Sequence, residues 1–285
     1  MKAEASSFGA GTIVNAIATG KGVAFGLALR AAATAEAKPE GFGVRARVRD
    51  GVDPTLVRLG AERVLKHRHL RAGLEVSVDS EIPISRGLKS SSAVANAVVL
   101  ASARALGIEL EPFDLIRIGV EAALEAGVTI TGAFDDACAS FFGGVVVTDN
   151  LARKLLAVDR LPEDLRAVIH VPDRTITKPS LAKRDFASIR PQIEEAFRLA
   201  LRGDLFAAME ANSAAYAPLL GVDEGPAIRA RAAGATAVGI TGTGPAIIAL
   251  AKPARVDAVR EAMDDGTSQV RVVGLNTLRA REVIL

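Results

Sequence analysis

The sequence is poor in the residues that mark several common classes of protein. It has one cysteine, one tyrosine and no tryptophan among 285 residues, and aromatic residues make up 4%. A single cysteine, Cys138, excludes an intrachain disulfide framework, and its apolar neighbours favour a small core residue. No apolar run reaches the roughly 18 residues that indicate a transmembrane helix, and no secretory leader opens the chain. We therefore expect a cytoplasmic protein without a membrane partner.

The chain also lacks a strong charge of either sign. Its formal net charge is +2, so its composition predicts no field that would attract nucleic acid. Hydrophobic residues make up 49% of the chain. That content supplies an extensive core and, at this length, predicts one large or two medium domains.

Two widespread nucleotide-binding patterns are absent as well. The closest match to the Walker pattern, at 15–22, has Asn15 in place of the first glycine and Gly22 in place of the hydroxyl residue. The dinucleotide pattern Gly-x-Gly-x-x-Gly fails at 9–14 and at 242–247. The sequence therefore predicts neither a P-loop enzyme nor a Rossmann domain.

Periodicity predicts a mixed succession of strands and helices. Residues 5–37 are typical of strands with tight turns, and the alternation over 42–49 predicts a half-exposed strand. Helices are expected at 53–71, at 91–106 as a buried element, and at 112–126, where proline begins the segment and glycine follows it. The later expected elements are strands at 73–79, 144–148 and 166–171, helices near 189–202 and 204–216, and a final helix-strand-strand-helix-strand series.

The most informative segment is 83–93, which joins an expected strand to the start of the buried helix. It comprises Pro83, Ile84, Ser85, Arg86, Gly87, Leu88, Lys89, Ser90, Ser91, Ser92 and Ala93. A strand, a polar loop with glycine and a helix N-terminus together favour an anion site, because free N–H groups converge there and glycine lets a ligand approach the main chain. The alternative is an ordinary serine N-cap, although a cap needs only one hydroxyl.

Three further segments carry candidate site residues. Asp135 and Asp136 are adjacent acids among apolar and small residues, where a carboxylate could orient a substrate hydroxyl and accept its proton. The alternative is an N-cap for a helix that starts near residue 137. Residues 239–250 place a glycine-rich turn between two strands, and Lys21 is either a charge near a phosphate or a solvated turn lysine. The candidate residues of the loops on the substrate side are Asn15, Gly242, Thr243 and Gly244.

These motifs, in this order, resemble those of the GHMP kinases, the galacto-, homoserine, mevalonate and phosphomevalonate kinases. The second motif of that family reads roughly Pro-x-x-x-Gly-Leu-Gly-Ser-Ser-Ala. The matching residues are Pro83, Gly87, Leu88, Ser90 and Ser91. Lys89 stands where the family has glycine, and Ser92 stands where it has alanine. This variant resembles the archaeal-type shikimate kinase branch, and the resemblance extends over nearly the whole chain.

The resemblance implies an α+β protein with the two-domain GHMP kinase fold. Residues 1–160 would form the N-terminal ATP-binding domain, similar to domain 2 of ribosomal protein S5 and with a left-handed crossover. Residues 161–285 would form a ferredoxin-like C-terminal domain. ATP and the acceptor would meet in the cleft between them.

The same resemblance implies a small-molecule kinase that uses ATP and Mg²⁺. The implied reaction phosphorylates the 3-hydroxyl of shikimate, a step of chorismate and aromatic amino-acid biosynthesis. The alternatives are another GHMP kinase, such as a homoserine kinase, and a non-catalytic ATP-binding module. Asp136 is the implied base, because Gly143 follows it by seven residues and Glu125 precedes it by eleven, as in the family. Ser91 and Glu125 would bind Mg²⁺, and Lys21 would support the transferred phosphate.

Overall fold

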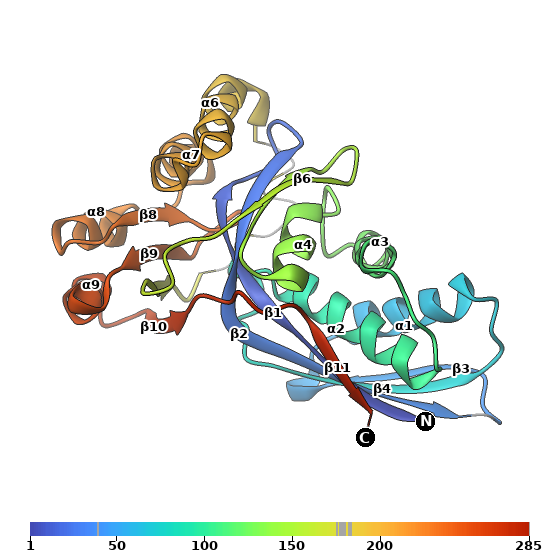
Figure 1. Cartoon of the computed structure of the whole chain (residues 1–285). Coiled ribbons are helices and arrows are strands. Elements are labelled where there is room, and N and C mark those ends of the chain that lie inside the picture. Colours follow the sequence, from blue (N-terminus) through green and yellow to red (C-terminus); the bar gives the residue numbers. More distant parts are fainter. Residues whose placement is uncertain (39, 175, 177–180, 182–183, 285) are drawn as a thin grey trace.

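The computed structural model describes residues 1–284 except 39, 175, 177–180, 182 and 183. Its strands form two sheets, one of seven strands and one of four. Figure 1 shows α1 to α4 gathered with the first sheet and α6 to α9 with the second, while β1 and β2 reach from one half to the other. No described helix has the length and apolar character needed to cross a membrane.

The first sheet is built around a long hairpin. Its strands are β1 (Lys2–Val14), β2 (Lys21–Lys38), β3 (Gly43–Val48), β4 (Gly73–Ser80), β5 (Val145–Asp149), β6 (Lys154–Asp159) and β11 (Arg281–Ile284). The main path runs β11-β1-β2-β4-β3, and β5 pairs with both β2 and β6. Within this sheet β3 and β4 are parallel and joined through α1, whereas the other pairs are antiparallel. The left-handed sense of that crossover stays a prediction.

Helices α1 (Thr55–His67), α2 (Ser90–Ala105), α3 (Pro112–Glu125) and α4 (Phe134–Phe142) cover this sheet. The predicted burial of α2 is confirmed, since almost every residue from Ser92 to Ala105 is buried. Its alanines and serines keep the helix thin, so it packs against both β1 and β2. The start of α2 is thereby fixed against the sheet at the point where the segment 83–93 ends.

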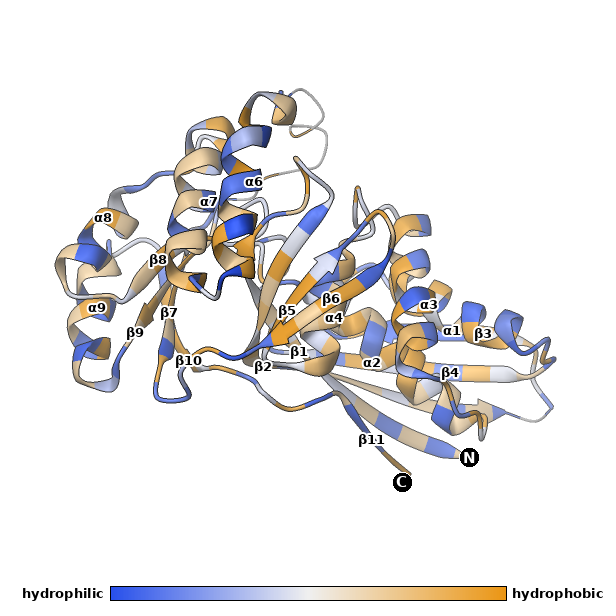
Figure 2. Ribbon diagram, turned by 45° about the horizontal axis from the view of Figure 1, so that its top comes forward, coloured by the Kyte–Doolittle hydropathy of each residue, from blue (hydrophilic) through white to orange (hydrophobic). Residues whose placement is uncertain are grey.

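The second sheet has the order β10-β7-β9-β8 and is antiparallel throughout. Its strands are β7 (Arg166–Val171), β8 (Ala237–Ile240), β9 (Ile247–Ala251) and β10 (Gln269–Gly274). Its helices are α6 (Arg190–Leu201), α7 (Leu205–Leu220), α8 (Gly225–Ala232) and α9 (Val256–Met263). The strands, numbered along the chain, lie in the order 4-1-3-2, as expected of a ferredoxin-like unit. In Figure 2, α8 and α9, which pack on this sheet, alternate between hydrophilic and hydrophobic segments, as helices with one face on a sheet do.

The last described strand returns to the first sheet. β11 pairs with β1 in the register Ala3 with Ile284 through Ser6 with Arg281, so the two chain ends lie side by side (Figure 1). The predicted domain boundary at residue 160 lies just after β6, and it stays a prediction. Residues 281–284 nevertheless belong structurally to the sheet of residues 2–159.

Two expected helix bounds differ from the structure. The helix expected over 53–71 ends at His67, because Arg68 leaves the helical conformation and His69 adopts a positive φ of 52°. The helix expected to start near residue 137 begins at Phe134, so Asp135 and Asp136 lie inside its first turn. The interpretation of either acid as the N-cap is therefore wrong, since the N-cap is Ala133.

Candidate functional site

A cavity of about 830 Å³ lies where the two halves meet. Four segments line it: the loop and helix start at 83–91, the loop and helix start at 127–136, the hairpin tip at 15–17, and the glycine loop at 242–244. At one end the lining is mainly apolar. The apolar residues there are Val48, Val52, Leu56, Val57 and Val78. The cavity therefore joins an apolar pocket to a polar zone with four loops, two of which lead into helix N-termini.

The loop before α2 has a backbone suited to an anion. Ser85, Gly87 and Lys89 have positive φ angles of 57°, 82° and 65°. Left-handed residues alternating with others turn successive N–H groups to one side, which is the arrangement of an anion-binding nest. The N-cap of α2 is Lys89, and no side chain caps the helix, so the serine N-cap interpretation is wrong. Ser90 and Ser91 line the cavity instead.

Packing between two loops requires glycine at position 87. A Cβ atom at this position would lie 2.1 Å from the carbonyl oxygen of Thr241. The hydroxyl of Thr241 donates a hydrogen bond of 2.8 Å to the Gly87 carbonyl. Gly87 also lines the cavity, so the expectation that it lets a ligand approach the main chain stays a prediction.

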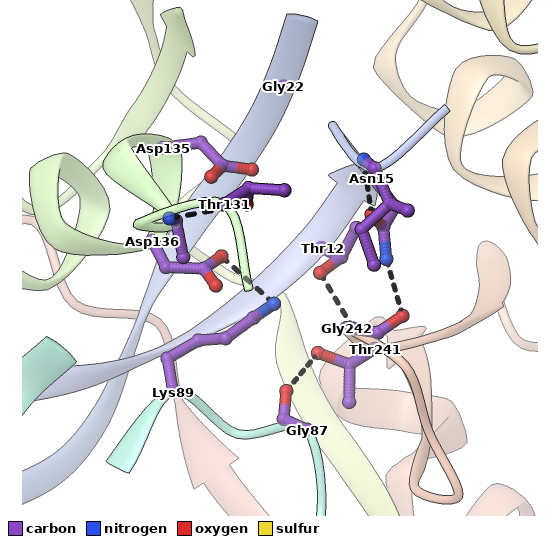
Figure 3. A network of polar contacts seen from close by, with 12 residues as sticks. Thr12, Asn15, Gly22, Gly87, Lys89, Thr131, Asp135, Asp136, Thr241 and Gly242 are labelled. Carbon is purple, nitrogen blue, oxygen red and sulfur yellow. Dashed lines mark hydrogen bonds and ion pairs between the residues drawn. The ribbon is translucent and has the colours of Figure 1, made fainter. Parts of the chain in front are cut away.

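Asp136 faces the cavity from the first turn of α4. Its Oδ1 lies 2.9 Å from the Nζ of Lys89, and its side chain is 14% exposed. This buried oxygen has no hydrogen bond of regular geometry. Burial, with the neighbouring charge of Asp135, raises the pKa of Asp136 to about 7, against the opposing effect of Lys89. Figure 3 shows the side chains of Lys89 and Asp136 pointing toward one another. The carboxylate is therefore able to accept a proton near neutral pH.

Asp135 has different surroundings although it is the adjacent residue. It is buried, and its Oδ1 accepts a hydrogen bond of 2.7 Å from the side-chain amide of Asn150. The Asn150 Oδ1 in turn accepts the backbone N–H of Asp135 and the hydroxyl of Thr148. A Cβ on Gly22 would lie 2.3 Å from Asp135 Oδ2, so the absence of a side chain there admits this carboxylate. Nothing in the sequence marked Asn150, because its role depends on β5 lying beside α4.

The hairpin tip and the glycine loop are joined by hydrogen bonds (Figure 3). The amide of Asn15 donates to the Gly242 carbonyl at 2.7 Å, and the Gly242 N–H donates to the hydroxyl of Thr12 at 2.8 Å. The other polar atoms of Asn15 bond to Asn212, Tyr216 and Ile17. Asn15 therefore lines the cavity and holds the hairpin tip to the glycine loop by hydrogen bonds. Thr243 and Gly244 also line the cavity.

Two predicted residues are not brought to the cavity. Lys21 has its ammonium 5.6 Å from the ring centroid of Phe197 on α6, and it is not among the lining residues. Glu125 is half exposed and forms an ion pair of 2.7 Å with Arg63. Of the segment 83–93, three residues do not line the cavity: Arg86, Ser92 and Ala93. The roles given to Lys21 and Glu125 stay predictions, and their positions do not favour them.

Comparison with known protein families and sequences agrees with the geometry. The model of the GHMP kinases N terminal domain matches residues 55–144, and that of the GHMP kinases C terminal region matches 227–267. The chain is 45% identical to the shikimate kinase of Methanothrix thermoacetophila over 92% of its own length and 90% of that protein. It is 44% identical to the shikimate kinase of Thermococcus kodakarensis, covering 88% and 92%.

Solved structures give the same fold at low sequence identity. A homoserine kinase from Cytophaga hutchinsonii superposes with a TM-score of 0.82 at 19% identity, covering 99% of this chain and 97% of that one. The mevalonate kinase of Methanococcus jannaschii gives 0.77 at 15% identity, covering 97% and 98%. These likenesses show the two-domain α+β fold. With the sequence relatives, they establish that the chain belongs to the GHMP kinase family.

Proposed function

We propose that this chain transfers the γ-phosphoryl group of ATP to the 3-hydroxyl of shikimate. The observation that carries the proposal is the meeting of Asp136, a buried carboxylate ion-paired with Lys89, with an anion-binding loop inside one cavity. The acceptor is inferred from relatives at 44–45% identity that are named shikimate kinases. A kinase of this family acts on a small molecule, and the cavity volume of about 830 Å³ lies within the range of small-molecule sites.

The cavity fits a nucleoside triphosphate along its length. The apolar end, lined by valines and Leu56, suits a flat base. The left-handed residues of the loop before α2 and the N-terminus of that helix direct N–H groups and a positive dipole end toward phosphate. This division into an apolar and a polar end supports ATP as the phosphoryl donor.

Magnesium would be held with few protein ligands. Among the described residues, no group of three or more His, Cys, Asp or Glu side chains could hold a metal ion. Mg²⁺ commonly takes one or two protein ligands and completes its shell with phosphate oxygens and water. Ser91 lines the cavity and could provide a hydroxyl ligand, whereas Glu125 would first have to leave Arg63. Bound Mg²⁺ would neutralise phosphate charge during the transfer.

Asp136 would act on the acceptor hydroxyl. Its carboxylate would accept the hydrogen bond of that hydroxyl, orient it, and take its proton as the new P–O bond forms. The bond from the γ-phosphorus to the bridging oxygen breaks, and ADP leaves with that electron pair. Asp135 would hold the first turn of α4 in place through Asn150. Positioning and electrostatics carry most of the catalysis in such transfers.

The experiment is an acceptor assay with purified protein, ATP and Mg²⁺. ADP release is measured with shikimate, homoserine, mevalonate or no acceptor, and the position of the phosphate is read by NMR. We expect shikimate 3-phosphate and much poorer turnover of the other two. Equal turnover of homoserine would overturn the acceptor and leave the kinase class standing. No acceptor-dependent ADP release from a folded protein that binds ATP would favour a non-catalytic module.

A further inference from the structure

Lys89 occupies a backbone position that favours glycine. Its φ and ψ are 65° and 30°, in the left-handed region, at the N-cap of α2. A residue with a Cβ atom is disfavoured there, and the related motif of the GHMP kinases has glycine at this position. Strain of this kind clusters at functional sites and persists where the surrounding structure holds it in place. What lysine offers at this position and glycine does not is its side chain.

That side chain ends at the centre of the polar zone. It is 7% exposed, and its Nζ lies 2.9 Å from Asp136 Oδ1. A Cβ on Gly242 would come within 3.0 Å of the same Nζ, so the ammonium also lies beside the glycine loop. Figure 3 shows Lys89 reaching from the start of α2 toward α4. One ammonium thus pairs with α4 and lies near the glycine loop, two of the other segments that line the cavity.

Lys89 also provides the one basic side chain in the described cavity lining. Among the described residues that line the cavity it is the only lysine or arginine, beside three carboxylates, Asp53, Asp135 and Asp136. Lys21, the lysine expected to support the phosphate, lies against Phe197 instead. Charge that develops on a transferred phosphoryl group needs a preorganised cation to stabilise it. The described lining offers one side chain for that task.

Resting on the function proposed above, we propose that Lys89 is a catalytic residue that orients Asp136 in the free protein and stabilises the phosphoryl group during its transfer. Lysine suits both roles, because a compact ammonium can face a carboxylate and a phosphoryl oxygen together. Lys89 keeps its proton throughout. The proton of the acceptor goes to Asp136 as the hydroxyl oxygen bonds to the γ-phosphorus and ADP departs.

The first test compares Lys89→Met, which removes the charge, with Lys89→Gly, which also relieves the backbone. Both should lower kcat on the order of 10²-fold, the usual loss for one transition-state donor, with little change in the KM for shikimate. Lys89→Gly should melt no lower than Lys89→Met, and Lys89→Arg should retain more activity than Lys89→Met. If the variants are so much less stable to heat that unfolding explains their lower kcat, the proposal is overturned. A larger fall in kcat for Lys21→Met than for Lys89→Met would also overturn it.

The second test needs no acceptor, so it separates this proposal from the proposed substrate. Calorimetry measures the affinity of the wild type and Lys89→Met for ATP with Mg²⁺, and for ADP with Mg²⁺ and aluminium fluoride, a mimic of the transferred group. We expect a small loss for ATP and a much larger one for the mimic. Equal losses would make Lys89 a simple nucleotide-binding residue and overturn the catalytic role. If the wild type turns over another acceptor better than shikimate, the kinetic test is run with that acceptor.

Discussion

Two walls of the cavity differ in how their polar groups are used. At the first turn of α4, Asp136 has a buried oxygen without a regular hydrogen bond and faces a lysine in a strained conformation. At the hairpin tip, each polar atom of Asn15 has a partner within the protein. A buried carboxylate that faces a buried ammonium suits proton transfer, whereas the hydrogen bonds of Asn15 join neighbouring loops. We infer that the first wall reacts and that the second one holds the loops.

The strongest test of this comparison is Asp136→Asn. The amide keeps the size of the carboxylate and cannot take a proton, so kcat should fall roughly 10²-fold or more, the scale of general-base loss. ATP affinity should be nearly unchanged by calorimetry. Asp135→Asn is the matched control, and it should cost less because Asn150 can still donate to an amide oxygen at that position. If Asp135→Asn were inactive and Asp136→Asn active, Asp135 would be the base and Asp136 the structural residue.

The reacting wall also contains one residue that serves packing. Gly87→Ala should lower the free energy of unfolding by about 2 to 4 kcal/mol, because the new Cβ meets the Thr241 carbonyl and the backbone is left-handed. Gly43→Ala is the control: its φ of +81° is close to the +82° of Gly87, and nothing lies within 4 Å of its Cβ. It should cost about 1 kcal/mol. Denaturant unfolding measures both, and equal costs would remove the packing argument.

The pH dependence of kcat/KM sharpens the contrast between the two acids. Because burial raises the pKa of Asp136 to about 7, the base is protonated below that pH, and kcat/KM should fall about tenfold per unit below it. The described charges that act on Asp136 are Lys89, which lowers its pKa, and Asp135, which raises it. Asp135→Asn should therefore lower the pKa of Asp136 and move the fall in kcat/KM to lower pH. If the fall in kcat/KM below pH 7 persists in Asp136→Asn, the titration belongs to another group.

The smallest expected effect lies in the holding wall. Tyr216, the one tyrosine of the chain, is fully buried, donates to the Asn15 carbonyl and accepts the Ala18 N–H. Tyr216→Phe leaves those groups without a partner and should cost about 1 to 3 kcal/mol. Thermal melting would show this, while kcat at a temperature well below melting should change little. A large fall in kcat without a change in melting would contradict the division between the walls.

Much of the fold could be predicted from residue patterns. The alternation over 42–49, the apolar helix after residue 90 and the final helix-strand-strand-helix-strand series all match the structure. The three motifs also come together in one cavity, as the resemblance to the GHMP kinases implied. These features depend on local periodicity and on glycine-rich turns, which a sequence shows directly.

Other features depend on contacts that no local pattern records. The spacing of eleven residues between Glu125 and Asp136 does not fix a shared direction, because the loop 126–133 separates the two helices and Glu125 turns toward Arg63 on α1. The pairing of Lys89 with Asp136 needs a left-handed residue that glycine statistics would not assign to lysine. Asn150 becomes the partner of Asp135 only because β5 lies beside α4.

The pairing of β11 with β1 also bears on how the protein can be divided. Residues 281–284 complete the edge of the first sheet, although the rest of that sheet lies before residue 160. A fragment that ends at residue 160 would present the bare N–H and C=O groups of β1, which are a template for aggregation. A soluble single-domain fragment would need those four residues grafted back through a linker. In the intact chain the contact joins residues as distant as Ala3 and Ile284. We expect such distant pairing to form late in folding, because its loop entropy must be overcome first.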